Sequence, residues 1–552
     1  MKVFEALAEA LRAEGVKTLF GLMGDANMSL WSVLLARGIA QIHSARNEAG
    51  AVAMADGYHR ATGRVGVATV TCGPGLTQIG TSLMAASRNR SAIVIVTGEW
   101  PVNSPNDLQV MDQRRFVEAC EARYVAARPG PRLAQDIASA FCMAQLRRCP
   151  VVLAVPNELQ DAEFTGNWHY VPSVERLPAA ATTASAQDTA LLVQALRDAR
   201  HPILLAGRGA RQARARQQII DLAERTGALL GTTLQVRGMF SEHPWSMGLI
   251  GGYGSAATTE LCGQADLVIG IGARIEHYTS WGGTLFPQAR VIRIDNADPP
   301  VDLSQTPGTY IRGDAAQVLD QVLYELAEVR PTTGFRTNQT KALLTVPGAA
   351  HREAQGGLDP RMAALRLSEL LDKECRLTCG VGHFQGFAVN YMTLPQNIDV
   401  EYSVQFGAVG QTLPLAIGIG AANPHQRHVV IEGDGSLLMN IQELDLATTS
   451  GLPMTLIVWN DGGYGAEAHR LPGKGFSAAP ATWKSPDFVA IARGFGADGM
   501  RVESWDDLNA AMRRARETSG LFLIDLRISP QETSDTYLKN FYAKPNQSPF
   551  QP

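Results

Sequence analysis

Short apolar runs rich in β-branched residues alternate with helical stretches along the whole chain, and this alternation restricts the fold more than any other feature. Runs without polar interruptions are typical of parallel strands that helices bury on both faces. The pattern therefore predicts an α/β fold of doubly wound parallel sheets. The expected strands are residues 63–71, 92–97, 150–155, 202–206, 265–271, 290–295, 428–432, 454–460 and 521–526.

Two stretches without such periodicity divide the 552 residues into three blocks. At about 150 residues per domain, this length suggests three or four domains. Residues from about 161 to 187 and from about 330 to 357 contain turn-forming residues and are predicted to be linkers. We therefore expect domains at 1–165, 185–330 and 355–530. The final stretch, 531–552, lacks periodicity and is predicted to be a loose tail or a lid.

Charge and cysteine usage exclude several classes of protein. The net charge of −4 argues against a nucleic-acid-binding protein and does not favour a membrane surface. Seven cysteines without a CxxC pair predict a reduced, cytoplasmic protein with neither a disulfide framework nor a zinc site. The first 14 residues have helical spacing and do not resemble a signal peptide. No apolar run approaches the roughly 20 residues that span a bilayer.

The clearest chemical signal is the segment Gly433-Asp434-Gly435-Ser436, which follows an expected strand and precedes a helix expected from Leu438 to about Ser450. The next strand ends at Asp461, 27 positions after Asp434. Both carboxylates thus lie at the carboxyl edge of the sheet, where ligands bind in open α/β folds. An isolated GDG would more simply cap a turn, but this context favours a binding site.

The residue types in this segment suit a metal held together with phosphate. Glycines let the backbone approach a bulky anion, and the following helix offers free N–H groups. Two carboxylates and a carbonyl from the loop at Gly462-Gly463 are oxygen ligands of the kind that Mg²⁺ prefers.

These residues resemble the metal–diphosphate motif of thiamine diphosphate enzymes. In that family the metal is held by the Asp of GDG, an Asn or Asp 27 residues later, and a carbonyl two residues further on. The resemblance therefore implies Asp434, Asp461 and the carbonyl of Gly463 as metal ligands. Because the second ligand is commonly Asn, the neighbouring Asn460 stays open as an alternative.

Further motifs, in the same order along nearly the whole chain, are similar to the acetolactate synthase and pyruvate decarboxylase group. They are Arg46-Asn47-Glu48-Ala49-Gly50-Ala51, Met54-Ala55-Asp56-Gly57-Tyr58, Arg60-Ala61-Thr62-Gly63, Cys72-Gly73-Pro74-Gly75, Leu413-Pro414, Ala416-Ile417-Gly418 and Asn440-Ile441-Gln442-Glu443-Leu444. The resemblance implies thiamine diphosphate and Mg²⁺, a pyrimidine-binding first domain and a diphosphate-binding third domain. It also implies a homodimer or homotetramer with active sites at the subunit interface.

Glu48 opens an Ala-rich helix, where partial desolvation would make a carboxyl a useful proton partner. The helix dipole alone would also favour a Glu in the first turn. By resemblance, Glu48 hydrogen-bonds the aminopyrimidine ring of thiamine. The resemblance also implies that Val409 lies beneath the bent cofactor as a wedge and that the Gly407 carbonyl faces the pyrimidine amino group. Val is smaller than the residue usual at this position, and an ordinary core role for Val409 is the alternative.

Four positions are expected to determine which reaction the enzyme catalyses and on which substrate. Asp25 and Glu467 match acid/base positions of pyruvate decarboxylases, while Gln109 matches an active-site Gln of acetolactate synthases. A capping Asp25 and a solvated Glu467 are the simpler alternatives. The Trp that selects the acceptor in acetolactate synthases is replaced by Arg470, which either holds an acidic substrate or faces water.

The middle block corresponds to the domain that holds a non-redox FAD in acetolactate synthases. Its loop Gly207-Arg208-Gly209-Ala210 is an incomplete GxGxxG, because position 212 is Gln. Gly272-Ala273-Arg274 fits the FAD pattern, but Glu276-His277 stand where acidic pairs are usual, and these departures weigh against FAD.

The sequence therefore predicts an enzyme that decarboxylates a small 2-oxo acid, with pyruvate as the first candidate, and transfers the acyl anion equivalent to a second carbonyl compound. Simple decarboxylation with release of an aldehyde is the alternative reaction. A non-catalytic cofactor-binding relative and a flavin or nicotinamide oxidoreductase are the rival classes, and the joint presence of Glu48, Asp434 and Asp461 speaks against the former.

Overall fold

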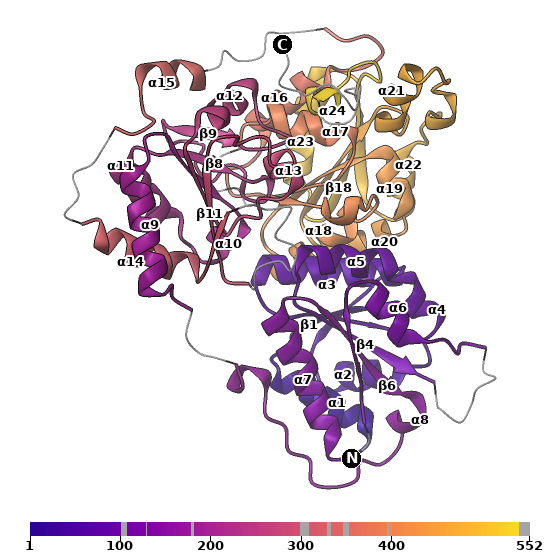
Figure 1. Ribbon diagram of the computed structural model, residues 1–552. Coiled ribbons are helices and arrows are strands. Elements are labelled where there is room, and N and C mark those ends of the chain that lie inside the picture. The colour runs from indigo at the N-terminus through magenta and orange to yellow at the C-terminus, as the bar shows by residue number, and fades with distance from the viewer. Residues whose placement is uncertain are drawn as a thin grey trace.

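The computed structural model describes residues 1–100, 108–128, 130–177, 182–297, 308–327, 333–345, 353–394, 398 and 400–539. It contains three six-stranded sheets, each covered by helices (Figure 1). Every strand pairing described is parallel. The predicted α/β class with three doubly wound parallel sheets is confirmed. Among the described residues, none of the helices is both long and apolar enough to cross a membrane.

The first sheet has the strand order β2-β1-β3-β4-β6-β5, so the order reverses between β1 and β3. Its strands are β1 Thr18–Gly21, β2 Gln41–Ser44, β3 Gly66–Val70, β4 Ile93–Glu99, β5 Arg123–Ala126 and β6 Pro150–Pro156. Its helices are α1 Val3–Ala13, α2 Met28–Ala36, α3 Glu48–Thr62, α4 Pro74–Gln78, α5 Gly80–Asn89, α6 Gln113–Ala119, α7 Arg132–Arg147 and α8 Asn157–Gln160, followed by the 3₁₀ turn η1 Ser173–Glu175.

The middle sheet has the order β12-β11-β10-β7-β8-β9 and reverses between β7 and β10. Its strands are β7 Pro202–Ala206, β8 Leu229–Thr232, β9 Ser246–Leu249, β10 Leu267–Ile271, β11 Arg290–Asp295 and β12 Thr309–Arg312. The helices are α9 Ala186–Asp198, α10 Arg208–Gln212, α11 Arg216–Thr226, α12 Ala256–Gln264, α13 His277–Ser280, α14 Ala315–Glu325 and α15 Asn338–Leu344, with the 3₁₀ turn η2 Leu234–Val236.

The third sheet repeats the order of the first, as β14-β13-β15-β16-β18-β17, and reverses between β13 and β15. Its strands are β13 Arg376–Cys379, β14 Val400–Tyr402, β15 His428–Gly433, β16 Met454–Asn460, β17 Asp498–Val502 and β18 Leu521–Arg527. The helices are α16 Pro360–Leu370, α17 His383–Tyr391, α18 Thr412–Ala422, α19 Asp434–Met439, α20 Glu443–Thr449, α21 Gly465–Gly473, α22 Phe488–Gly494, α23 Trp505–Glu517 and α24 Asp535–Tyr537, with the 3₁₀ turns η3 Gln405–Gly407 and η4 Ala479–Ala481.

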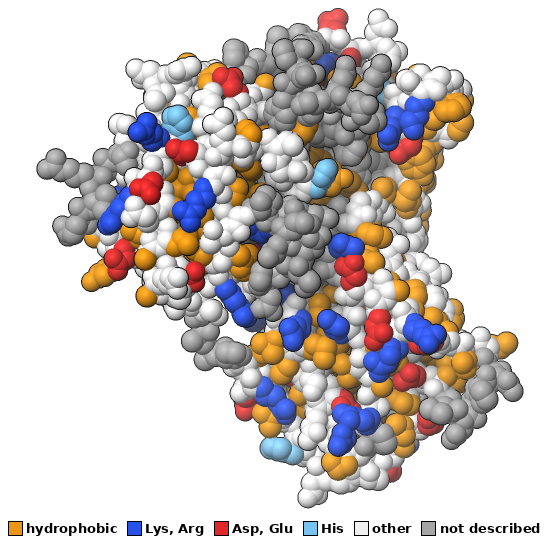
Figure 2. All heavy atoms as spheres, in the orientation of Figure 1, with side chains coloured by type: hydrophobic (Ala, Val, Ile, Leu, Met, Phe, Trp, Pro, Cys, Tyr) orange, Lys and Arg blue, Asp and Glu red, His pale blue; other side chains and the backbone are white. Residues whose placement is uncertain are grey.

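The first and third domains share one hydrophobic core, because α3 and α18 cross in direct backbone contact at the domain boundary (Figure 1). A Cβ at Gly57 would overlap the carbonyl oxygen of Leu415, and a Cβ at Gly418 would overlap that of Met54. Glycine at these two positions therefore sets how closely the domains approach. On the face shown in Figure 2, basic and acidic side chains are interspersed, as the net charge of −4 suggests.

All nine predicted strands are present, with ends within three residues of the prediction. One prediction is wrong. The helix expected at 438–450 is two helices, α19 and α20, which break at Asn440, where the side-chain amide donates to the Gly410 carbonyl. The stretch predicted as the second linker contains the short helix α15, and residues 328–332 and 346–352 lie outside the described part of the chain.

His428, at the start of β15, makes the stability of the C-terminal domain depend on pH. It is 2% exposed, its Nε2 lies 2.7 Å from Thr378 Oγ1, and burial lowers its pKa to about 3. An unfolded His has a pKa of about 6.5, so protons bind the unfolded chain preferentially. The contribution of His428 to stability is thus complete above about pH 6.5 and is lost as the pH falls towards 3.

We expect this histidine alone to remove about 1.4 kcal/mol of stability per pH unit below pH 6.5. Thermal unfolding of wild type and His428→Gln between pH 7 and pH 5 checks this, with a shallower slope expected for the variant. His169→Gln, at an exposed position, is the matched control and should keep the wild-type slope. Parallel slopes for wild type and His428→Gln would contradict the assignment.

Candidate active site

The reversal of strand order in the third sheet opens a crevice beyond the carboxyl ends of β13 and β15, and two carboxylates stand there. Asp434 begins α19 directly after β15, and Asp461 follows β16. Asp434 is 1% exposed, and its Oδ2 has no hydrogen-bond partner in the described structure. Burial raises the pKa of both carboxyls, and the charge of Asp461 raises the pKa of Asp434 further. Such a pair is costly unless a cation joins it.

Asn460 is the alternative to Asp461 as a metal ligand, but both the nitrogen and the oxygen of its side-chain amide form hydrogen bonds within the protein. Its Nδ2 donates to Asp525 at 2.8 Å, and its Oδ1 accepts from the Ser485 hydroxyl at 2.6 Å. It is buried in the sheet, whereas Asp461 and Gly463 line the cavity at the strand end. The arrangement favours Asp461 as the group that faces a ligand.

The segment around Gly407 and Val409 is held against the loop that contains Asp434. The backbone N–H of Gly410 donates to Ser436 Oγ at 3.0 Å, and the Ser436 hydroxyl donates to the buried Glu432 at 2.6 Å. Gly407 and Gly410 have positive φ angles of 65° and 81°, which the turn requires. Val409 is 36% exposed and is therefore no ordinary core residue.

Glu48 lies at the carboxyl edge of the first sheet. It is the first residue of α3, whose N-cap, Asn47, accepts from the N–H of Ala49 at 2.8 Å. The Glu48 carboxylate is half-buried, and its Oε1 lies 3.3 Å from where a Cβ on Gly75 would stand. A side chain at position 75 would overlap Thr71 and crowd the Glu48 carboxylate, so the close approach of these segments requires glycine.

Asp25 and Gln109 lie at the same edge of the first sheet. Asp25 is exposed in the turn after β1, beside Asn27, whose Oδ1 accepts from the N–H of Gly24 at 2.8 Å. Gln109 is half-buried, with Oε1 3.5 Å from the sulfur of Cys72. Both predicted residues therefore lie at the same edge of the first sheet as Glu48.

A cavity of about 1730 Å³ opens at the crevice of the third sheet and extends into the middle domain. The predicted residues that line it are Gly407, Val409, Gly433, Asp434, Gly435, Ser436, Asp461, Gly463 and Glu467. Glu48, Asp25 and Gln109 do not line it. One chain therefore presents two separate groups of predicted site residues. The exposed Arg470 is likewise absent from the cavity wall.

His383, to which no sequence motif points, lines one wall of the cavity, with His469 beside it. His383 is 4% exposed, its Nε2 accepts from the N–H of Ser534 at 3.1 Å, and burial lowers its pKa to about 3. The rings of His383 and His469 are 4.6 Å apart, and Tyr537 lies 5.1 Å from His383. The preceding strand, β13, has only four residues, too few for a strand pattern that would locate this edge of the sheet.

The tail residues up to 539 are packed in place. The Asn390 amide donates to Thr536 at 2.7 Å, the Tyr391 hydroxyl donates to Asp535 at 2.8 Å, and Thr533 lies 3.1 Å from His469. This part of the predicted tail lies over the cavity wall, and residues 540–552 are outside the described structure.

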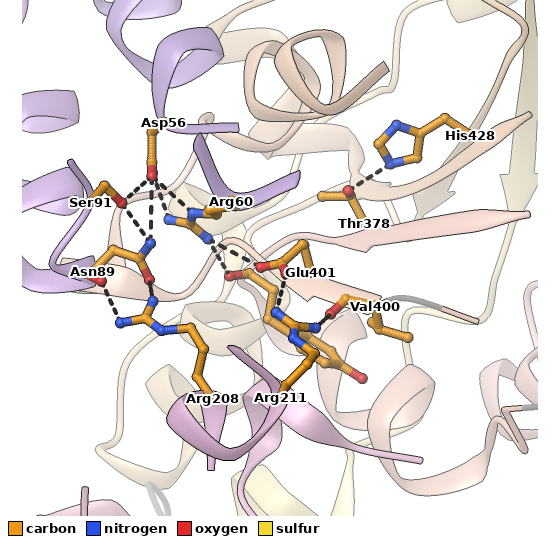
Figure 3. A network of polar contacts seen from close by, with 11 residues as sticks. Asp56, Arg60, Asn89, Ser91, Arg208, Arg211, Thr378, Val400, Glu401 and His428 are labelled. Atoms are coloured by element: carbon orange, nitrogen blue, oxygen red, sulfur yellow. Dashed lines mark hydrogen bonds and ion pairs between the residues drawn. The ribbon is translucent and has the colours of Figure 1, made fainter. Parts of the chain in front are cut away.

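At the far end of the cavity, a polar network joins all three domains (Figure 3). Arg60 on α3 donates to Asp56 at 3.0 Å and 2.6 Å and to the Tyr402 carbonyl at 3.2 Å. Arg211 on α10 pairs with Glu401 on β14. The network fixes the middle domain against the other two.

This end of the cavity carries an excess of positive charge. Arg208 donates to the side chain and carbonyl of Asn89 in the first domain. Burial, together with Arg60 and Arg274, lowers the pKa of Arg208 to about 9. The loops Gly207–Gly209 and Gly272–Arg274 meet at the point where the middle sheet reverses its order, which is a place suited to an anionic ligand.

Three family models match the chain in the order of its three sheets. They are described as the N-terminal TPP binding domain (residues 1–116), the central domain (189–322) and the C-terminal TPP binding domain (380–526) of thiamine pyrophosphate enzymes. The chain belongs to the thiamine diphosphate enzymes of the acetolactate synthase and 2-oxo acid decarboxylase superfamily.

Relatives within this superfamily cover nearly the whole chain. Acetolactate synthase 1, chloroplastic, of Oryza sativa is 28% identical over 96% of this chain and 85% of its own length. The acetolactate synthase of Arthrospira platensis is 28% identical over 96% of this chain and 94% of its own. A probable acetolactate synthase large subunit of Methanocaldococcus jannaschii is 27% identical over 96% and 93%. The thiamine diphosphate enzyme is thus similar to acetolactate synthases over 96% of its length.

Proposed function

We propose that this enzyme uses thiamine diphosphate and Mg²⁺ to decarboxylate a small 2-oxo acid, with pyruvate as the first candidate, and transfers the acyl anion equivalent to a second carbonyl compound. The observation that carries the proposal is the pair formed by the buried Asp434 and the half-buried Asp461 at the carboxyl ends of β15 and β16, with Asp434 Oδ2 left without a partner in the described structure. The cytoplasmic location inferred from cysteine usage stays a prediction.

The donor set fits Mg²⁺. The described residues contain no group of three or more His, Cys, Asp or Glu side chains that would form a protein-only metal site. Asp434, Asp461 and the Gly463 carbonyl would therefore hold the ion together with diphosphate oxygens, as hard oxygen ligands do for Mg²⁺.

Thiamine diphosphate, when held by these residues, would supply a nucleophilic carbon and an electron sink for decarboxylation. Glu48, half-buried at the first turn of α3, holds a proton at the aminopyrimidine ring. Val409, exposed on the cavity wall, supports the rings, and the Gly407 carbonyl orients the pyrimidine. Asp25 and Glu467 exchange protons with the reacting groups, and Gln109 donates to the substrate.

Within one chain, the two groups of predicted site residues do not share a cavity. Glu48 lies outside the cavity that contains Asp434 within one chain. We therefore propose a homodimer, or a homotetramer of two dimers, in which the Glu48 edge of one copy faces the Asp434 edge of the other.

Product analysis by NMR tests the reaction. The protein with thiamine diphosphate, Mg²⁺ and pyruvate, with and without an added aldehyde, should form acetolactate, acetoin or a mixed acyloin. Acetaldehyde alone would instead favour the decarboxylase, for which the exposed carboxylates of Asp25 and Glu467 are the specific argument. Absence of turnover with pyruvate would reject it as the substrate.

Asp461 gives a direct test of the metal site. Asp461→Ala should weaken Mg²⁺ binding by at least about 100-fold, since even outer-shell changes cost roughly 10–100-fold. Asp461→Asn keeps an oxygen ligand and should bind Mg²⁺ far better than the Ala variant. Titration calorimetry with Mg²⁺ in the presence of thiamine diphosphate measures both. Equal affinities for wild type and Asp461→Ala would contradict the assignment.

An FAD-type dinucleotide is the further cofactor that suits the end of the cavity lined by Arg60, Arg208 and Arg274. Arg60, Arg208 and Arg274 complement a diphosphate, while the incomplete glycine motif gives a dinucleotide fewer close backbone contacts. A flavin absorption spectrum in the purified protein supports FAD binding, and a colourless protein contradicts it.

A further inference from the structure

Glu443, the first residue of α20, is buried against the loop that leads into Glu48. Its side chain is 0% exposed, and its Oε1 accepts from the backbone N–H of Arg46 at 3.0 Å. The backbone of Asn47 also hydrogen-bonds the carboxylate, while Oε2 has no partner in the described structure. Burial raises the pKa of Glu443 to about 7. A carboxylate of the third domain therefore contacts the two residues directly before Glu48.

The neighbouring residues are arranged around this contact. Gly50 leaves the space that the Glu443 carboxylate occupies, because a Cβ there would lie 2.6 Å from Oε1. The Arg46 side chain donates from Nε to Asp445 at 2.7 Å at the partly exposed rim. The buried Glu443 therefore holds the backbone of the loop before Glu48, and the partly exposed Asp445 holds the Arg46 side chain.

Packing of the first domain against the third does not by itself explain why a carboxylate, Glu443, occupies this position. Burying an ionisable group with one oxygen unsatisfied is costly, and an apolar side chain would hold the two domains together at lower cost. What an apolar side chain cannot do is accept the N–H groups of Arg46 and Asn47. The contact therefore constrains the backbone conformation of the loop.

We propose that Glu443 is a positioning residue, which fixes the backbone from Arg46 to Glu48 so that the Glu48 carboxylate points at the bound cofactor. The inference rests on the proposed role of Glu48. Glu443 itself is too far into the domain interface to meet solvent, and it acts through the loop.

Three variants distinguish positioning of the loop by Glu443 from an effect of its charge and from simple packing of the two domains. Glu443→Ala removes the acceptor and should lower kcat by roughly 10²-fold, since a displacement of about 1 Å of a reacting group has effects of that size. Glu443→Gln keeps an acceptor oxygen at the same place and should restore most of the activity. Asp445→Ala removes only the rim ion pair and should change kcat by less than about 5-fold.

Amide hydrogen exchange of residues 44–50 in the cofactor-free protein gives a readout that does not depend on turnover. Exchange should accelerate in Glu443→Ala and stay at the wild-type rate in Glu443→Gln. Titration with thiamine diphosphate, followed by tryptophan fluorescence, should give affinities within a few-fold of wild type for both. Gly50→Ala, which displaces the Glu443 carboxylate, should reproduce the effects of Glu443→Ala on kcat and exchange.

The inference is overturned if Glu443→Ala keeps the wild-type kcat, if Glu443→Gln is as impaired as Glu443→Ala, or if exchange of residues 44–50 is unchanged. Failure of the proposed function is distinguishable from these outcomes. A fully active Glu48→Ala variant would reject the role of Glu48, whereas the exchange measurement tests the Glu443 contact by itself.

Discussion

Replacement of Glu48 by Gln is expected to lower kcat by about 10²–10⁴-fold, the range for loss of a general acid–base group. The carboxamide fills the same half-buried space beside Gly75 but cannot take up or hold the proton. The affinity for thiamine diphosphate should change by no more than about 10-fold, the value of one hydrogen bond. Steady-state kinetics with pyruvate and a cofactor titration measure the two effects separately.

Glu158→Gln makes the same chemical change at an exposed position of the first domain and serves as the control. It should retain the wild-type kcat and cofactor affinity. A Glu48→Gln enzyme with wild-type kcat would remove Glu48 from the proton transfers. It would leave the fold-level assignment to thiamine diphosphate enzymes intact, because that assignment rests on the three domain matches.

The second large effect is expected from Gly418→Ala at the crossing of α3 and α18. The added methyl group would overlap the backbone carbonyl of Met54, and backbone atoms cannot move aside as a side-chain tip can. Overpacking of this kind costs about 1–3 kcal/mol or more. Since about 1 kcal/mol lowers Tm by roughly 2–4 °C in domains of this size, a loss of several degrees is expected by scanning calorimetry.

Gly494→Ala provides a matched control for this substitution. Gly494 ends α22, its Cβ position is open, and its φ is not positive. Alanine favours a helix over glycine, so this variant should be as stable as wild type or slightly more stable. Equal Tm values for Gly418→Ala and Gly494→Ala would show that α3 and α18 do not meet as closely as the structure has them.

Some strands can be predicted from the sequence pattern alone, and others cannot. Apolar runs such as those of β4 and β16 identify buried strands by composition alone, and both were predicted. Strands of three or four residues, such as β8 and β13, carry too few residues for a pattern. Pairing with neighbours on both sides makes them strands, and that pairing depends on the sheet as a whole.

The break between α19 and α20 has a similar cause. The local sequence from 438 to 450 favours one helix, but the Asn440 amide donates to the Gly410 carbonyl from a distant segment. That tertiary hydrogen bond outweighs the small cost of ending one helix and starting another. Short-range propensity could not have indicated it.

The sequence by itself determined the superfamily resemblance, the three parallel sheets and the positions of Asp434, Asp461 and Glu48 after strands or at a helix start. These features depend on residues close together in the chain. Only the tertiary structure decided that Asn460 is bound within the sheet, that His383 lines the cavity, and that Glu48 lies outside it. The contact of Glu443 with Arg46 joins residues 397 positions apart. Such contacts follow from how whole domains pack, which no local pattern records.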